Sequence, residues 1–63
     1  QMIANAMSAR MKELGMTQKM LAEKMNCTQQ YISKILKGRE NLSLEAISKI
    51  ENALYIHFLQ MDE

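Results

Sequence analysis

The sequence predicts an all-α fold, a small bundle of four to five helices formed by one domain over residues 1–63. Of the 63 residues, 48% are hydrophobic, which suffices for one core and is too high a fraction for a disordered chain. The chain has no proline, and its only glycines are Gly15 and Gly38, so few positions interrupt a helix. Apolar residues also recur at helical spacing over most of the chain.

Two helices are expected in the first part of the chain. The first spans about residues 3–14, where one apolar stripe is formed by Ile3, Met7, Met11 and Leu14. Gly15 ends this helix, and Met16 packs under the turn that follows. The second helix begins after Thr17, whose hydroxyl can accept from free N–H groups, and ends at Asn26, which tolerates a left-handed conformation. Its inward residues are Leu21, Ala22 and Met25.

A third helix is expected between Thr28, a second capping threonine, and Gly38. With about 100° per residue, one arc of this helix is polar and consists of Gln29, Gln30, Ser33, Lys34 and Lys37. The other arc is mostly apolar and consists of Thr28, Ile32, Ile35 and Leu36. The polar arc has no carboxylate, which suits contact with a polyanion. Two short helices joined by a tight turn over residues 17–38 have the outline of a DNA-reading helix-turn-helix.

A fourth helix is expected after a loop at residues 39–42. Ser43 is its N-cap, Glu45 lies in its first turn, and its inward stripe is Leu44, Ile47, Ile50 and Leu54. Residues 55–61 then alternate in polarity, which predicts a short strand that pairs with the same strand of a second copy. The alternative is a helical continuation, since Leu54, Phe58 and Met61 also fit a helical stripe. The expected dimerisation segment spans about residues 54–61.

The net charge of +1 hides an uneven distribution along the chain. Residues 1–39 carry seven basic and two acidic residues, a balance of +5, whereas residues 40–63 carry one basic and five acidic residues, a balance of −4. This asymmetry indicates a polyanion partner for the first half, with ordinary surface scatter as the alternative. Residues 1–9 do not have the basic start of a signal peptide, no apolar run is long enough to span a membrane, and the single cysteine gives no sign of export, so a cytoplasmic location is expected.

The residues of the helix-turn-helix also carry a family resemblance. They are Leu14-Gly15-Met16-Thr17-Gln18, Leu21-Ala22-Glu23-Lys24-Met25, Thr28-Gln29-Gln30-Tyr31-Ile32-Ser33-Lys34-Ile35, Gly38, and Leu44, Ile47, Ile50, Ala53 and Leu54. In this combination the chain resembles the Cro/repressor-type helix-turn-helix domains, also called the Xre family, over residues 3–54. Three departures are Asn26 in place of the usual turn glycine, Cys27 in place of a common valine, and a last segment without the fifth-helix pattern of phage repressors.

The resemblance implies a lambda-repressor-like bundle that binds double-stranded DNA, with the third helix in the major groove. The candidate base-contacting residues are Gln29, Gln30, Ser33 and Lys34. The candidate phosphate-contacting residues are Gln18, Thr17, Thr28, Tyr31, Lys37, Arg39 and Asn41. The resemblance also implies that Gln18 braces Gln29. The expected function is that of a homodimeric repressor that occupies an operator.

Several alternatives remain open from the sequence. Residues 42–54 are also similar to antitoxins of the host-inhibition-of-growth type, which would add a toxin protein as partner. A protein-interaction module without DNA binding is the alternative from another class. Tyr31 suits phosphate contact or packing equally, and Cys27 is expected to be a small buried hydrophobe rather than a redox sensor. No catalytic constellation, metal-ligand spacing around His57 or cofactor motif is found, so no enzyme, metal or cofactor is expected.

Overall fold

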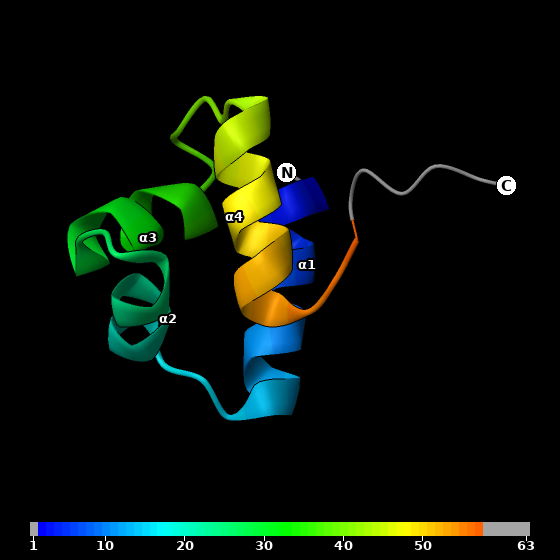
Figure 1. The fold of residues 1–63 in the computed structure, drawn as a ribbon. Helices are drawn as coiled ribbons and strands as arrows, with labels where there is room; N and C mark the ends of the chain where they lie inside the picture. The colour runs from blue at the N-terminus through cyan, green and yellow to red at the C-terminus, as the bar shows by residue number, and fades with distance from the viewer. Residues whose placement is uncertain (1, 58–63) are drawn as a thin grey trace, which may run out of the picture.

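The computed structural model describes residues 2–57, which fold into four helices without a strand in that range (Figure 1). The helices are α1 (Met2–Leu14), α2 (Gln18–Met25), α3 (Gln29–Leu36) and α4 (Leu44–Leu54). α1 and α4 lie alongside one another, and α2 and α3 pack together on one side of that pair. The all-α prediction is confirmed, and none of the described helices is long and apolar enough to cross a membrane.

Hydroxyl side chains begin three of the helices, as the sequence predicts. The Oγ1 of Thr17 accepts from the Met20 N–H at 3.1 Å, and that of Thr28 accepts from the Tyr31 N–H at 3.0 Å. Ser43 caps α4 in the same way, with its Oγ 3.1 Å from the Ala46 nitrogen. Each cap satisfies a backbone donor that the helix itself leaves free, so the starts of α2, α3 and α4 are fixed by local chemistry.

All four helices end in the same manner. A left-handed residue directly follows α1, α2 and α4, whereas in α3 it comes one residue later, after Lys37; these residues are Gly15, Asn26, Tyr55 and Gly38, with φ between 58° and 71°. The next N–H then bonds to a carbonyl five residues earlier, at 2.8–3.1 Å, in the pairs Met16–Met11, Cys27–Ala22, Arg39–Lys34 and Ile56–Glu51. This closure satisfies carbonyl groups of the last turn. The predicted roles of Gly15, Asn26 and Gly38 as helix ends are thus confirmed.

Every helix contributes to one core. Its largest fully buried side chains are Met7, Leu21, Ile32, Ile35, Ile50 and Leu54. Ala22 is 4% exposed, in agreement with its expected place where α2 must pack closely. Leu14 and Leu44 are exceptions among the predicted inward residues, because Leu14 is 38% exposed at the last position of α1 and Leu44 is 70% exposed at the first position of α4.

The C-terminal segment differs from both sequence-based alternatives where it can be followed. α4 ends at Leu54, and Tyr55 is left-handed (φ 58°, ψ 43°) rather than extended. Residues 55–57 form neither helix nor strand. The cause is local, since the Ile56 N–H bonds back to the Glu51 carbonyl and the Ile56 side chain packs against the core. Residues 58–61, the rest of the predicted strand, lie outside the described residues.

Candidate nucleic-acid interface

The exposed side of α3 carries the candidate base-contacting residues. Gln29, Gln30 and Lys34 are exposed and Ser33 is half-buried, whereas Ile32 and Ile35 on the other side are at most 1% exposed. The helix is therefore held by its apolar arc and presents its amides and lysine to solvent. Amide side chains in such a position can bond bidentately to the N6 and N7 edge of adenine.

The cap at Thr28 places the two glutamines at the start of the helix. Because Thr28 accepts from the Tyr31 N–H, Gln29 and Gln30 occupy the first two helical positions, next to N–H groups that have no partner within the helix. The positive end of the helix dipole lies at the same place. Geometry and partial charge thus favour an anionic partner at the start of α3.

Most of the candidate phosphate-contacting residues lie at the two ends of the α2–α3 unit, and Thr28 lies in its turn. Thr17 is exposed and Gln18 half-buried at the start of α2, while Lys37, Arg39 and Asn41 are exposed in the segment after α3. Thr28 is exposed as well. Within residues 2–57 no hydrogen bond joins Gln18 to Gln29, so the bracing contact stays a prediction for the DNA-bound state.

Tyr31 has a packing role. Its side chain is half-buried against the core cluster, which supports the packing alternative, and its hydroxyl makes no hydrogen bond within the described residues. A role in phosphate contact stays a prediction.

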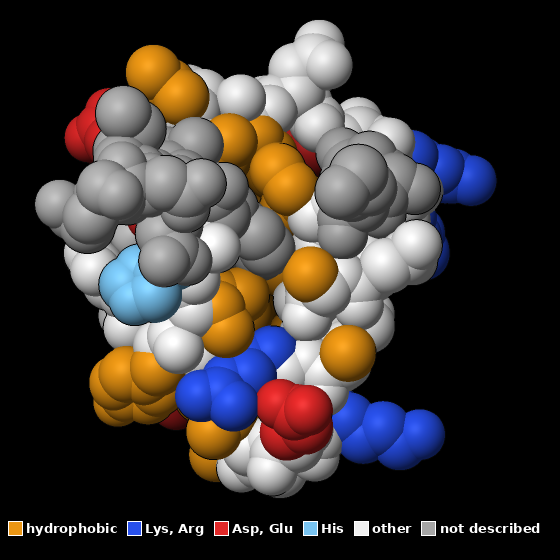
Figure 2. Space-filling view, turned by 90° about the vertical axis from the view of Figure 1, so that its right-hand side faces the viewer, with side chains coloured by type: hydrophobic (Ala, Val, Ile, Leu, Met, Phe, Trp, Pro, Cys, Tyr) orange, Lys and Arg blue, Asp and Glu red, His pale blue; other side chains and the backbone are white. Residues whose placement is uncertain are grey.

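The charges of this surface are available to a partner. Lys34, Lys37 and Arg39 form no ion pair within residues 2–57, and no carboxylate lies on α3. The face turned away from α3 has a different character: charged groups are mixed there with exposed hydrophobic side chains around His57 (Figure 2). The molecule therefore presents an acid-free helix on one side and a partly apolar surface on the other.

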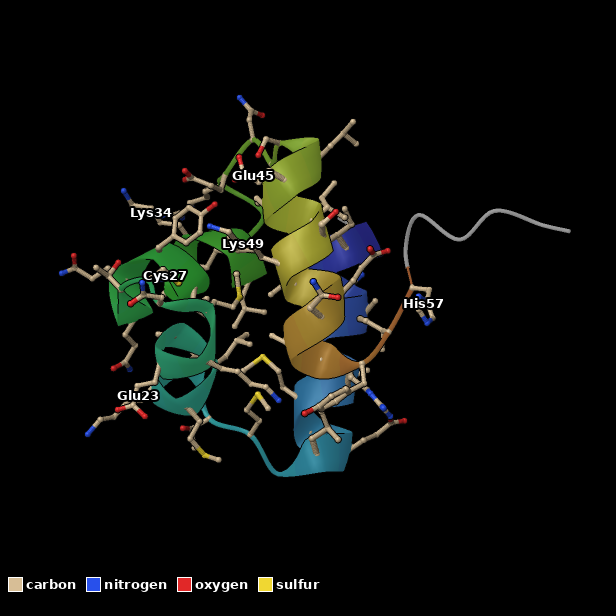
Figure 3. The ribbon with its side chains drawn as sticks, in the orientation of Figure 1. Glu23, Cys27, Lys34, Glu45, Lys49 and His57 are labelled. Atoms are coloured by element: carbon tan, nitrogen blue, oxygen red, sulfur yellow. The ribbon has the colours of Figure 1, made fainter. Side chains whose placement is uncertain are left out.

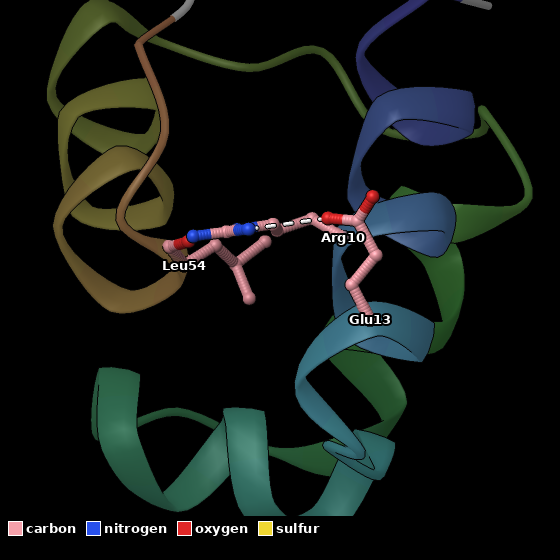
Figure 4. Close-up of polar contacts among 3 residues, drawn as sticks. All are labelled: Arg10, Glu13 and Leu54. Carbon is pink, nitrogen blue, oxygen red and sulfur yellow. Dashed lines mark hydrogen bonds and ion pairs between the residues drawn. The ribbon is translucent and has the colours of Figure 1, made fainter.

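Three polar contacts of the scaffold were not predicted from the sequence. The Arg10 Nε donates to the Leu54 carbonyl oxygen at 2.9 Å, and an Arg10 Nη1 pairs with Glu13 Oε1 at 3.1 Å (Figure 4). The Lys24 Nζ donates to the Tyr55 hydroxyl at 2.6 Å and lies 4.1 Å from the centre of its ring. The hydrogen bond and the positive charge of Lys24 lower the pKa of Tyr55. The sequence alone indicates only the positive charges of Arg10 and Lys24.

A groove lies beside the start of α3. It has a volume of about 510 Å³ and runs between the α2–α3 turn and the first half of α4. Cys27 from the α2–α3 turn and Lys49 from α4 both line it (Figure 3), and burial raises the pKa of the Cys27 thiol while the Lys49 charge lowers it to a smaller extent. Cys27 is half-buried and packs against the core, as expected for a small hydrophobe. Among the described residues, no cluster of side chains could hold a metal ion.

Comparison with known proteins gives one match. The family model described as helix-turn-helix matches residues 7–59, which covers all of α2, α3 and α4 and most of α1. Neither a curated protein nor a solved structure matches the chain significantly.

Proposed function

Because the chain belongs to the Cro/C1-type helix-turn-helix family of DNA-binding domains, we propose that it reads a specific double-stranded DNA sequence as part of a transcriptional regulator. Repression by occupying an operator is the output that we propose, in the cytoplasm, where such a regulator meets DNA. The family consists of DNA-binding domains rather than enzymes, which agrees with the absence of a catalytic motif in the sequence.

The observation that carries this proposal is the exposed, acid-free arc of α3. We propose that α3 lies in the major groove, with Gln29, Gln30, Ser33 and Lys34 toward the base edges. Glutamine suits adenine, whereas lysine suits guanine or phosphate. The apolar arc of α3 is fixed in the core, so these side chains are presented by a rigid element, as base reading requires.

The proposed phosphate contacts flank this helix. We place Thr17, Gln18 and Thr28 against the backbone on one side, and Lys37, Arg39 and Asn41 on the other. Tyr31 remains a candidate through its hydroxyl, which makes no hydrogen bond within residues 2–57. Such contacts fix the position of the protein on the duplex and supply most of the salt-dependent affinity, but they carry little sequence information.

We further propose that residues 1–63 act as one domain, with the helix-turn-helix at about residues 17–38, and that two copies pair through the segment at about residues 54–61. The described part of this segment supports the location, because His57 lies on the side turned away from α3 (Figure 3). A pair formed on that side leaves both α3 helices free. Two-fold pairing of this kind suits half-sites about 34 Å apart.

The dimer is tested by sedimentation of the full chain and of a chain that ends at His57, over a range of concentrations. We expect the full chain to form dimers and the shortened chain to remain monomeric with an unchanged circular dichroism spectrum. Monomers in both cases, or dimers in both cases, would show that this segment does not hold the pair.

An antitoxin role is a narrower form of the same proposal and rests on the sequence of residues 42–54 alone. It predicts that a small, basic, ribonuclease-like protein purifies with the chain from its natural source. Recovery of the chain without such a partner would favour a stand-alone regulator.

Selection from random duplex DNA tests the function itself. We expect an enriched, two-fold symmetric sequence, bound with an affinity that falls steeply as the salt concentration rises. A protein-interaction module without DNA binding would enrich no sequence and show no salt-dependent binding. That result would overturn the proposed function.

A further inference from the structure

The groove beside α3 is formed by three segments that are separate in sequence. The end of α2 and the turn after it contribute Met25 and Cys27, α3 contributes Tyr31, and α4 contributes Glu45, Ala46 and Lys49. A second hollow of about 390 Å³ continues along α4 and shares Met25, Asn26 and Lys49 with the first. Pockets that hold small molecules have volumes of about 300–1,000 Å³, so each hollow has room for a small ligand.

The lining combines an apolar wall with few charges. Met25, Cys27, Ala46 and the ring of Tyr31 offer apolar surface, and Lys49 lines the same groove. Lys49 forms no ion pair within residues 2–57.

Two neighbouring charges define what the groove accepts. Glu45 lines the groove near the start of α4, and Lys24 lines the second hollow, where its ammonium group already donates to the Tyr55 hydroxyl. Lys49 is thus the cation that remains available to a ligand. A cationic ligand would be repelled by the Lys49 ammonium group. A ligand with two anionic groups would bring the second one toward the Glu45 carboxylate, which would repel it.

We infer that this groove binds a small molecule with an apolar body and a single anionic group, with the anion at Lys49 and the body between Cys27 and Ala46. The groove is lined with apolar surface and a few convergent polar groups, which is the usual composition of a small-molecule site.

Binding in the groove is coupled to the recognition helix. Thr28 caps α3 and Tyr31 lies in its first turn, and both residues line the groove. A bound anion therefore adds negative charge next to the end of α3 that meets the polyanion. This step rests on the proposed function, and it makes the ligand an inducer that weakens DNA binding.

The first experiment uses no DNA. The full chain, labelled with ¹⁵N, is titrated with 2-naphthoate, with the neutral 2-naphthalenemethanol and with inorganic phosphate. We expect 2-naphthoate to shift the amide signals of Cys27, Thr28, Ala46 and Lys49, the alcohol to bind the same place more weakly, and phosphate to bind much more weakly than either. Shifts spread over other surfaces, or phosphate binding as tight as 2-naphthoate binding, would overturn the inference.

Variants separate the two parts of the site. Lys49→Gln should weaken 2-naphthoate binding about two- to fivefold, as expected for a solvent-accessible ion pair, and leave the alcohol unaffected. Lys12→Gln, on the exposed surface of α1, is the matched control and should change neither. Ala46→Phe should fill the groove and prevent binding of both compounds, whereas Ser48→Phe, an exposed position of α4 outside the groove, should not. Equal affinity of the Lys49→Gln and Lys12→Gln proteins for 2-naphthoate would show that Lys49 does not contribute to binding.

The second experiment measures DNA affinity with and without saturating 2-naphthoate on the sequence found by selection. We expect 2-naphthoate to lower the DNA affinity of the unaltered protein at least threefold and to leave that of the Ala46→Phe protein unchanged. By reciprocity, bound DNA should lower the affinity of the unaltered protein for 2-naphthoate by the same factor. Ligand binding without any effect on DNA affinity would contradict the coupling. If the protein binds 2-naphthoate but no DNA, the ligand site is supported and the proposed function is rejected.

Discussion

The side chain of Arg10 in α1 donates to the main-chain carbonyl of Leu54, the last residue of α4, across 44 positions of sequence. This carbonyl has no partner within its own helix, and the C-terminal end of a helix attracts positive charge. The contact therefore joins the first helix to the end of the last one. It lies on the scaffold and not on the proposed DNA surface.

Replacing Arg10 by alanine is expected to lower the free energy of unfolding by about 1–2 kcal/mol, because a charge-assisted hydrogen bond to a helix end is lost. Urea denaturation measures the change. Glu13→Ala is the control, since it removes only the exposed ion pair and should cost at most about 0.5 kcal/mol. Equal losses in the two variants would show that the Leu54 contact contributes nothing.

Asn26 tests the turn of the helix-turn-helix. Its φ of 59° is in the left-handed region, where a Cβ is unfavourable and where Asn is tolerated better than most residues. Asn26→Ala should therefore destabilise the fold by about 1 kcal/mol, whereas Asn26→Gly should be neutral or slightly stabilising. Denaturation midpoints compare the two proteins, and Glu23→Ala on the exposed surface of α2 should fall within about 0.5 kcal/mol of the original. A tolerated alanine at position 26 would contradict the argument.

Gln29 and Lys37 separate base reading from phosphate contact. Gln29→Ala should cost about 1–3 kcal/mol of binding on the selected sequence and relax the preference at one base pair. Lys37→Ala should weaken binding to all sequences alike and lower the salt slope by about one. Competition binding at two salt concentrations measures both effects. An equal loss on selected and random DNA for Gln29→Ala would reject its role in base reading.

Cys27 offers a test through its ionisation. Because burial raises its pKa, the folded protein should hold less thiolate at neutral pH than the urea-unfolded chain, and alkylation by iodoacetamide should be slower and require higher pH. Lys49→Gln should raise the pKa further, since the Lys49 charge opposes the effect of burial.

The profile of alkylation rate against pH measures this pKa, with the unfolded chain as control. A midpoint for the folded protein at or below that of the unfolded chain would contradict the prediction. Cys27→Val should preserve both fold and DNA affinity, and mild oxidant should leave the affinity of the unaltered protein unchanged, because a buried cysteine acts as a small hydrophobe.

The features that were predicted from the sequence depend on short-range chemistry. The capping bonds of Thr17, Thr28 and Ser43 each span three residues, and the left-handed conformation of Asn26 follows from the nature of that side chain. Residue type and neighbours therefore suffice to locate these helix ends. The exposed arc of α3 was predictable for a similar reason, since a helical period places the polar residues on one side.

The features that were missed depend on residues far apart in sequence or on packing. Lys24 and Tyr55 are separated by 31 positions, and no local pattern pairs them. Tyr55 itself was expected to be extended, because its alternating neighbours suit a strand. Instead, Leu54 and Ile56 both pack in or against the core, and Tyr55 between them adopts the left-handed conformation. The groove beside α3 likewise requires the folded arrangement of α2, α3 and α4.

The methionines of the fold differ widely in their access to solvent. Met20 is 48% exposed, whereas Met7, Met11 and Met25 are at most 8% exposed. Conversion to the sulfoxide makes the side chain polar, which the surface tolerates and a core does not. Peroxide should therefore reach Met20 in the native bundle but attack the three core thioethers only when the bundle opens. The ratio of core to surface sulfoxide thus records how often the protein has unfolded during its exposure to oxidant.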